Sequence, residues 1–533
     1  MIWKRIFLFF IFSLFACVIC KSIFLYYSEL NSVQMLLQNN ENVRYIAKQY
    51  NQDIINVKTD TLDVVINLHN GEIEQTKLLK YKNKLSSFKK LTLFSKYDNS
   101  GSMHSGIVQK NDINHIHIKN KIHFFTYKKY FELINGEKIL YVPIFSNQNN
   151  GIRLIKTFVF KKGAYDIGVE YNIKNMSSKK ESFYLVGSLK HQNMPYNIFQ
   201  MFNRNITKDN FHDVAYSCDN CKYHKLSFNS ISNKKNLSFH SYTGWISMMQ
   251  KYFTIAFILN HSIHNTIHIY KNHDNQIVIG YKSSAFTILP HQEKVLRTTL
   301  WIGPKIQQDM LLVAPSLNLT VDYGLFFWLS EFFFRMLNIL HILLGNWGFS
   351  IIFIICLVRF ITYPLTKMQY IATVKTKMLQ PTVNNIKEKF KGDKKRINAE
   401  ILKLYNKNNI SPLGGLIPIL IQMPIFLSLY YMLVNAVELR HAPFIFWIDD
   451  LSSPDPLCIL PILMGISGFL IQRTLPSYHY SSSLKDIIIN FTPLVFTLFF
   501  LWFPSGLVLY YIFSNIVTII QQLIIFYDFK IID

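Results

Sequence analysis

Cysteine is scarce in this sequence, which holds six in 533 residues. A content this low excludes the small disulfide-stapled folds of secreted proteins. Cys218 and Cys221 form one CxxC pair, and a four-ligand zinc site would need two more ligands, for which His224 is the nearest candidate. Because those partners are missing, we predict a plain loop at this pair rather than a metal or redox centre.

Charged residues are also sparse, and basic residues outnumber acidic ones. Charged residues make up 17% of the chain and hydrophobic ones 50%, which excludes a disordered protein. The 32 acidic residues are outnumbered by 56 Lys and Arg, so the formal net charge is +24. A nucleic acid, a ribosome or a membrane surface would each attract such a chain, and the position of the basic residues has to decide among them. At 533 residues, the chain should contain at least two folding units.

Motifs for covalent catalysis are missing from the apolar C-terminal part of the chain. It contains no GxSxG, HExxH or Walker motif and no pair of carboxylates within an apolar segment. Internal repeats are missing as well, and the five apolar segments found there are few for the inverted repeats of a secondary transporter. We therefore do not expect an enzyme.

The first 27 residues begin with Lys4 and Arg5 and continue with an uncharged run at 6–20. This pattern suits either a signal-peptide core or a membrane span. No clean cleavage site follows, so we expect an uncleaved transmembrane anchor over 1–27 with a cytoplasmic N-terminus, because positive charges precede it. A lipoprotein cleaved before Cys17 stays an alternative, which an intact N-terminus in mass spectrometry would exclude.

Residues 28–60 are expected to form a linker, and residues 61–320 an antiparallel β-sandwich outside the cytoplasm. Leu62, Val64 and Ile66 alternate with more polar residues, as on a half-buried strand. Segments 152–160 and 165–173 flank a Lys-Lys-Gly-Ala turn and predict a hairpin. Further strands are expected at 253–259, 267–270 and 277–281. Turns at this spacing, with few helical patterns between them, are typical of a large sandwich.

An amphipathic helix is predicted over 323–345. Its polar residues recur at intervals of four, three and three, which places them on one stripe: Glu331, Arg335, Asn338 and His341. Five further segments approach the length of a membrane span, at 348–365, 416–434, 457–471, 487–503 and 507–526. Together they predict a five-helix core over 346–526, followed by a short tail at 527–533.

Loop charges orient these segments. The loop 367–407 carries 11 Lys and Arg against three acids, whereas the loop 435–456 is acidic. Basic loops stay in the cytoplasm, so an even number of spans has to separate the N-terminus from the basic loop. A spanning helix at 323–345 would make that number odd. We therefore place this helix on the outer membrane interface and expect both chain ends in the cytoplasm.

Arg359 is a single ionisable residue inside the predicted span 348–365. A charge at that depth costs on the order of 3 kcal/mol or more unless it faces water or protein. Gln422 lies at a similar depth in the next span, and polar groups also occur in the last two spans: Asn490, Thr492, Asn515, Gln521 and Gln522. Several polar groups at matching depth favour a wet cavity open to the cytoplasm. Snorkelling of Arg359 to the interface stays an alternative, and ordinary interhelical hydrogen bonding would explain Gln422 alone.

The basic loop predicts a helical hairpin over 367–411, with its turn at Lys391-Gly392-Asp393. Charges near the turn are Lys387, Lys394, Lys395 and Arg396. They suit contact with ribosomal RNA or with anionic lipid headgroups. Positive charge that does nothing but fix the topology explains them equally well.

Several longer motifs occur in the helical half of the chain. They are Asn346-Trp347-Gly348-Phe349-Ser350, Tyr363-Pro364-Leu365-Thr366-Lys367, Pro412-Leu413-Gly414-Gly415, Gln422-Met423-Pro424-Ile425-Phe426 and Phe503-Pro504-Ser505-Gly506-Leu507. These motifs resemble the YidC family of membrane protein insertases, strongly over 320–526 and more weakly through the β region. One span, a large external domain and five further spans resemble the Gram-negative bacterial branch of that family.

The resemblance implies an α+β protein of the bacterial inner membrane, with a periplasmic β-supersandwich and a five-helix transmembrane insertase core. It implies a chaperone that inserts nascent membrane proteins into the lipid, alone or with the Sec translocon, with no cofactor, metal, DNA or covalent chemistry. Positions matching the hydrophilic groove are Arg359 and Gln422, to which we add Asn515. Apolar positions matching the surface along which a substrate helix slides are Phe426, Met464, Phe499 and Tyr511.

The hairpin matches a cytoplasmic hairpin that the family needs for activity. Family members often end in a basic tail, whereas 527–533 holds a single Lys530, so any ribosome contact falls to the hairpin. A pore or solute carrier that uses Arg359 as an anion site stays a rival function. Unimpaired membrane-protein insertion together with lost solute flux, after depletion of the protein, would favour that rival.

Overall fold

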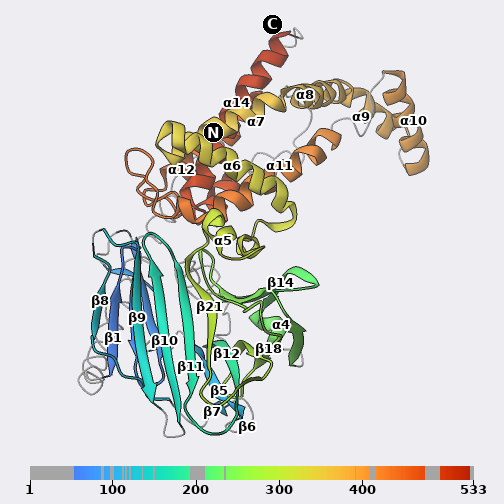
Figure 1. Ribbon diagram of the computed structural model, residues 1–533. Helices are drawn as coiled ribbons and strands as arrows, with labels where there is room; N and C mark the ends of the chain where they lie inside the picture. The colour runs from blue at the N-terminus through green and yellow to red at the C-terminus, as the bar shows by residue number, and fades with distance from the viewer. Residues whose placement is uncertain are drawn as a thin grey trace. The chain divides into compact units, whose positions relative to one another are not determined.

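The computed structural model describes residues 53–528, apart from short gaps between 84 and 150 and gaps at 193–210, 233–235, 391, 409–415 and 475–492. The predicted anchor at 1–27 and most of the predicted linker therefore lie outside the described residues. The described chain divides after Val321 into two compact units, here called the sandwich unit and the helical unit (Figure 1).

A five-stranded sheet opens the sandwich unit. Its order is β4-β3-β2-β1-β8, and β1 pairs antiparallel with β2 and parallel with β8. The strands are β1 (Ile54–Lys58), β2 (Leu62–Asn67), β3 (Glu72–Lys82), β4 (Lys90–Ser95) and β8 (Tyr130–Glu132). Leu62, Val64 and Ile66 are buried, as their alternation predicts. The predicted linker, however, ends too late, because Val57 and its neighbours pair with β2 and are part of the core.

An eight-stranded antiparallel sheet follows, in the order β14-β13-β16-β17-β21-β11-β10-β9. Its strands are β9 (Ile139–Asn147), β10 (Ile152–Lys161), β11 (Asp166–Asn175), β13 (Asp213–Cys218), β14 (Cys221–Ser227), β16 (Trp245–Met249), β17 (Phe253–Ile258) and β21 (Glu293–Pro304). The hairpin predicted at 152–173 is confirmed as β10 and β11, with Phe160 opposite Ile167. Gly163 in its turn has a φ of 76°, a conformation that favours glycine, and its N–H bonds the Asp60 carboxylate at 3.0 Å.

A six-stranded sheet completes the sandwich, in the order β15-β18-β19-β12-β20, with β5 also paired to β12. Its strands are β5 (Ser102–Gln109), β12 (Glu181–Gln192), β15 (Leu237–Ser241), β18 (Asn265–Lys271), β19 (Gln276–Ser283) and β20 (Phe286–Ile288). The smaller elements of this unit are β6 (Ile113–Asn114), β7 (His117–Ile118), α4 (Phe228–Ser232), α5 (Gln307–Val313) and η2 (Leu317–Thr320). Buried Phe158, Trp301 and Ile279 belong to the core of the unit, and the predicted antiparallel sandwich is confirmed.

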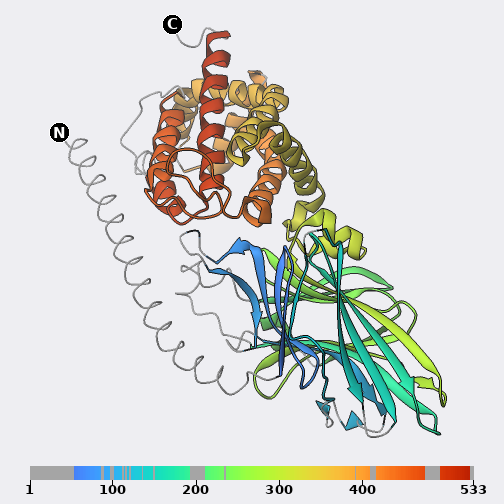
Figure 2. The same ribbon diagram turned by 60° about the vertical axis from the view of Figure 1, so that its left-hand side comes forward.

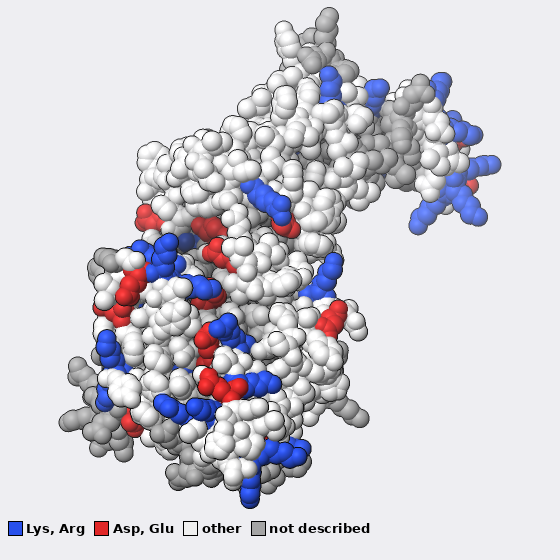
Figure 3. All heavy atoms as spheres, in the orientation of Figure 1, with Lys and Arg blue, Asp and Glu red and all other residues white. Residues whose placement is uncertain are grey.

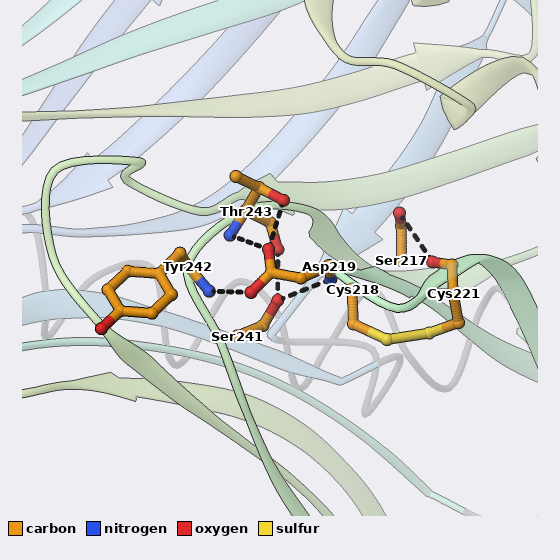
Figure 4. The surroundings of a disulfide bond; sticks show 7 residues. All are labelled: Ser217, Cys218, Asp219, Cys221, Ser241, Tyr242 and Thr243. Atoms are coloured by element: carbon orange, nitrogen blue, oxygen red, sulfur yellow. Dashed lines mark hydrogen bonds between the residues drawn. A yellow bond between two sulfur atoms is a disulfide. The ribbon is translucent and has the colours of Figure 1, made fainter.

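The CxxC pair is a disulfide, so the prediction of a plain loop was wrong. Cys218 ends β13 and Cys221 begins β14, and the two pair directly across the hairpin with a Cα–Cα distance of 5.0 Å (Figure 4). That distance lies within the range that a disulfide requires. Asp219, in the turn, accepts hydrogen bonds from Thr243 and from the Tyr242 N–H. These bonds lower the pKa of Asp219 to about 2 and tie the hairpin tip to the segment after β15.

The helical unit contains one long central helix, α14, drawn in red in Figure 2. Its elements are η3 (Gly324–Phe326), α6 (Phe327–Leu344), α7 (Trp347–Ile361), α8 (Tyr363–Met378), α9 (Gln380–Lys389), α10 (Lys394–Lys407), α11 (Leu416–Asn435), η4 (Val437–Leu439), α12 (Ile459–Thr474) and α14 (Ser505–Asp528). Residues 493–500 are also helical. Asn346 starts α7, because its side-chain oxygen accepts the N–H groups of Gly348 and Phe349.

Two described helical stretches are long and apolar enough to cross a membrane, at 324–344 and 505–527. The predicted span 348–365 is not straight, because α7 and α8 meet at 62°. Pro364 lacks the N–H that would continue the ladder to the Phe360 carbonyl, which explains the break. The placement of 324–344 on the outer interface stays a prediction from loop charges, since its length and composition also suit a span.

Candidate functional site

A cavity of about 280 Å³ lies inside the helical unit, between α7, α11 and α14. Its lining residues follow helical spacing on each helix, so each helix turns one face inward. From α7 and its end come Ile355, Val358, Arg359 and Thr362; from α11 come Gln422, Met423, Ile425, Phe426 and Leu429; from α14 come Tyr510, Tyr511, Ser514 and Asn515. The predicted groove residues Arg359, Gln422 and Asn515 therefore meet at one cavity.

The Arg359 guanidinium is held by a neutral partner. Its Nε and one terminal nitrogen donate to the Ser514 hydroxyl oxygen, at 3.2 and 2.5 Å. Among the residues that the structure describes, no carboxylate forms an ion pair with it. A guanidinium has five N–H donors, so this cation keeps donors that no described side chain occupies. Ser514 was not singled out from the sequence, although it lies on a stripe of α14 with Thr518, Gln521 and Gln522 at helical spacing.

The two amide side chains that line the cavity come from α14 and α11. Asn515 donates from its Nδ2 to the Ser467 hydroxyl at 2.9 Å, and Ser467 in turn donates to the Met464 carbonyl at 2.8 Å. These bonds tie α14 to α12. Gln422 also lines the cavity and makes no side-chain hydrogen bond with another described residue. The cavity thus combines one cation with amide and hydroxyl groups that can bond a polar guest.

The four predicted sliding residues divide into two pairs. Phe426 and Tyr511 both line the cavity, with ring centroids 5.5 Å apart. Met464 is buried on α12, and Phe499 is 54% exposed, and neither lines the cavity. Phe500, which the sequence did not single out, connects the pairs, because its ring lies 4.6 Å from Tyr511 and 5.6 Å from Phe499. An aromatic path therefore runs from the cavity to an exposed apolar side chain.

The loop between α11 and α12 packs against the start of α7, at the opposite end of that helix from Arg359. Asp455 is 1% exposed and accepts from the Trp447 indole N–H and from the backbone of Leu457 and Leu460, at 2.7–3.0 Å. Phe444 of this loop covers Gly348, where an added Cβ would lie 2.0 Å from the ring. The buried apolar residues of the loop include Ala436, Val437, Leu439, Ala442, Ile448 and Leu451. Packed side chains therefore hold this loop against the start of α7.

The basic residues of α9 and α10 stand apart from the cavity. Lys387, Lys394, Lys395 and Arg396 are all exposed. Asp393 begins α10 by accepting the Arg396 N–H at 3.1 Å, so one acid is used to cap the helix that carries the charges. Figure 3 shows Lys and Arg gathered at the tip of this hairpin, beside a helical surface with few charges.

Known proteins match this sequence along nearly its whole length. The family described as 60Kd inner membrane protein matches residues 339–531, and the YidC periplasmic domain matches residues 54–336. A membrane protein insertase YidC of Buchnera aphidicola subsp. Schizaphis graminum is 46% identical, over 91% of both chains. The protein of that name from Wigglesworthia glossinidia brevipalpis is 44% identical, over 90% of this chain and 88% of its own. A crystal structure of an active YidC insertase aligns with 89% of this chain and 93% of its own, at 15% identity and a TM-score of 0.38.

Proposed function

The chain belongs to the YidC family of membrane protein insertases, and from this premise we propose that it takes the polar tail of a nascent membrane protein into the cavity around Arg359. Members of this family are inner-membrane proteins with a periplasmic domain and transmembrane helices. The loop charges support a cytoplasmic position for the basic hairpin and both chain ends and a periplasmic position for the sandwich unit. The Cys218–Cys221 disulfide supports that orientation, because such bonds persist in the periplasm and are rare in the cytoplasm.

The first step lowers the cost of taking a polar tail out of water. An acidic side chain that leaves water loses its hydration, which costs several kcal/mol without a partner. Arg359 offers N–H donors that no described carboxylate occupies, and Gln422 and Asn515 offer amide groups beside it. The cavity thereby replaces part of the water that the tail gives up. The observation that carries the proposal is this cation, which no described carboxylate pairs, beside two amide side chains at a largely apolar cavity.

The second step moves the apolar part of the substrate into lipid. Each apolar residue gains roughly 0.3–0.6 kcal/mol at the centre of a spanning helix, so about twenty residues supply the driving force without a nucleotide. The aromatic path through Phe426, Tyr511, Phe500 and Phe499 leads from the cavity to an exposed side chain. We assign the substrate helix to this path, with Met464 supporting it from α12.

The packed loop between α11 and α12 keeps the far side closed during both steps. Buried Asp455 and the Phe444–Gly348 contact fix that loop, so a tail reaches the periplasm only after the substrate helix has moved sideways. The proposed partners are nascent membrane proteins, the Sec translocon and surrounding lipid. The exposed charges of α9 and α10 are proposed to bind ribosomal RNA or anionic headgroups.

Insertion into vesicles that contain only this protein tests the proposal. The substrate is a small membrane protein made in two forms, one with an acidic translocated tail and one with a neutral tail. Arg359→Gln should slow insertion of the acidic form by about tenfold to a hundredfold, the range expected for losing hydrogen bonds to a charged group, and leave the neutral form nearly unchanged.

Arg335→Gln is the matched control. Arg335 lies on α6, is exposed and already pairs with Glu331 at 2.6 Å, so its loss should alter neither substrate. Equal slowing of both tails by Arg359→Gln would contradict an electrostatic role for the cavity. Normal insertion of both forms by that variant, with altered anion flux across the vesicle, would favour a solute carrier instead.

A further inference from the structure

Two side chains of α14 hold Arg359 at two different points. The Ser514 hydroxyl accepts two hydrogen bonds from the guanidinium, at 3.2 and 2.5 Å. The Gln521 side chain donates from its Nε2 to the backbone carbonyl of Arg359, at 3.0 Å. Ser514 and Gln521 are seven residues apart, which is about two helical turns, so they project from the same face of α14. One face of α14 therefore fixes both the side chain and the backbone of a single residue on α7.

The end of α7 makes the backbone bond important. The last carbonyls of a helix have no partner within the helix, and a buried one costs free energy unless something else bonds it. The carbonyl of Val358 is satisfied by the N–H and hydroxyl of Thr362, at 2.9 Å each. The carbonyl of Arg359 accepts a long bond of 3.4 Å from the Thr362 hydroxyl and a shorter one of 3.0 Å from Gln521, which acts as a cap supplied by another helix. This cap stands where α7 gives way to α8 at 62°.

The side-chain bond decides where the charge lies. Arg359 is eight residues from Lys367, ~12 Å along a helix at 1.5 Å per residue, and a long Arg side chain can extend toward an interface to keep its charge in water. Ser514 is 4% exposed and gives the guanidinium an acceptor within the bundle. Because that acceptor is neutral, it holds the cation in place without cancelling its charge. A carboxylate at this position would hold the cation as well but would consume the attraction for an anion.

We propose that Ser514 is a positioning residue, which keeps the Arg359 guanidinium turned into the cavity while Gln521 anchors the end of α7 from which it projects. This role rests on the proposed function of the cavity. Ser514 does not touch the substrate in this scheme; it acts by fixing where the cation lies. Loss of its hydroxyl lets the guanidinium leave the cavity, and acidic tails lose the partner that lowers their cost of entry.

Ser514→Ala in the full-length protein tests this role with the acidic-tail and neutral-tail substrates. We expect insertion of the acidic form to fall by about tenfold, as for the loss of a hydrogen bond to a charged group, with the neutral form unchanged. Ser514→Thr keeps the hydroxyl and should restore the acidic form. A purely structural role of Ser514 in packing would slow both forms equally, and that result would overturn the proposal.

Thr518→Ala is the matched control on the same helix. Thr518 is 6% exposed, and its hydroxyl bonds the Ser514 carbonyl within α14 at 2.8 Å, so this change removes a buried hydroxyl without removing a partner of Arg359. It should leave the ratio of acidic to neutral insertion as in the unaltered protein. A shift in that ratio as large as the shift caused by Ser514→Ala would also overturn the proposal.

The double variant separates this inference from the function on which it rests. In an Arg359→Gln background, Ser514→Ala should cause no further loss for the acidic tail, because the group that it positions is gone. Additive losses would show that Ser514 acts independently of Arg359, and the inference would fall. A large effect of Arg359→Gln with no effect of Ser514→Ala would remove the inference and leave the proposed function intact. No effect of Arg359→Gln would remove the proposed function itself.

Discussion

Each unit holds a cation within its fold, Lys156 fully buried and Arg359 partly buried, and the two are treated in opposite ways. In the sandwich unit, Lys156 is 1% exposed, and its ammonium donates to the carbonyls of Gly71 and Ser105 and to the Ser105 hydroxyl, at 2.6, 2.7 and 3.1 Å. The rings of Phe158 and Tyr171 lie 4.9 and 5.4 Å from it. An ammonium has three N–H donors, and here three oxygens receive them. Nothing further can bind this charge.

Arg359 in the helical unit has five donors and, among the described residues, the Ser514 hydroxyl as its acceptor. It lines a cavity of about 280 Å³ instead of lying in a packed core. The difference teaches what separates a structural charge from an available one. Burial of a charge alone does not indicate a functional site. N–H donors without an acceptor among the described residues, beside a cavity, do indicate one.

The largest expected effect concerns Lys156, the cation whose three donors are all hydrogen-bonded. Burial lowers the pKa of Lys156 to about 7, against a partial opposing effect of Glu72. Between this value and the ordinary 10.5, the unfolded chain binds the proton and the folded chain does not, so stability should rise with pH across that window. The gain has an upper limit on the order of 5 kcal/mol, because one pKa unit corresponds to about 1.4 kcal/mol.

Lys156→Met should abolish that rise, which urea unfolding of the solubilised full-length chain at several pH values would measure. Lys161→Met is the control, because Lys161 is on the same strand but exposed and paired with Asp166 at 2.8 Å. If the unfolding free energy of Lys156→Met kept the same dependence on pH, the Lys156 ammonium would be no more costly in the fold than in water. The contrast between Lys156 and Arg359 would then not hold.

A second difference between the units is covalent. The Cys218–Cys221 bond closes a loop with a sequence separation of three residues, so it removes little freedom from the unfolded chain. Replacing both cysteines by serine should lower the stability of the sandwich unit by about 2 kcal/mol, from loop-closure entropy. Insertion of both substrates should stay unchanged, because this bond and the Arg359 cavity belong to different units. Thermal unfolding and the vesicle assay measure the two parts, and slower insertion at unchanged stability would contradict this separation.

The smallest expected effect comes from giving Arg359 a carboxylate partner, which no described residue supplies. Ser514→Asp places a carboxylate beside the guanidinium and turns the available cation into a paired one. Insertion of the acidic-tail substrate should fall by about tenfold, which is about 1.4 kcal/mol, with the neutral form unaffected. The vesicle assay measures both. Faster insertion of acidic tails in this variant would mean that attraction to a lone cation is not what the cavity supplies.

Local patterns in the sequence were enough for much of the architecture. Period-two alternation predicts β2 and the β10–β11 hairpin, because a strand with one buried face has to alternate. A charge within an apolar helix predicts a polar environment for Arg359, because lipid does not tolerate it. The same alternation puts Lys156 on the buried face of β10 between Leu154 and Phe158, so the sequence also marks a buried charge there.

Tertiary structure alone decided which groups meet. Ser514 is 155 residues from Arg359, and Gly71 is 85 residues from Lys156, so no periodicity within one element relates either pair. The Cys218–Cys221 bond likewise depended on β13 and β14 pairing in the register that sets the two residues opposite each other. Local sequence patterns already set which faces are buried and which charges lie in apolar surroundings, because the free energy of transfer from water depends on each side chain. Whether the donors of a charged group inside the fold are all hydrogen-bonded or remain free for a ligand depends on which distant segments pack against it. The folded chain alone fixes that packing.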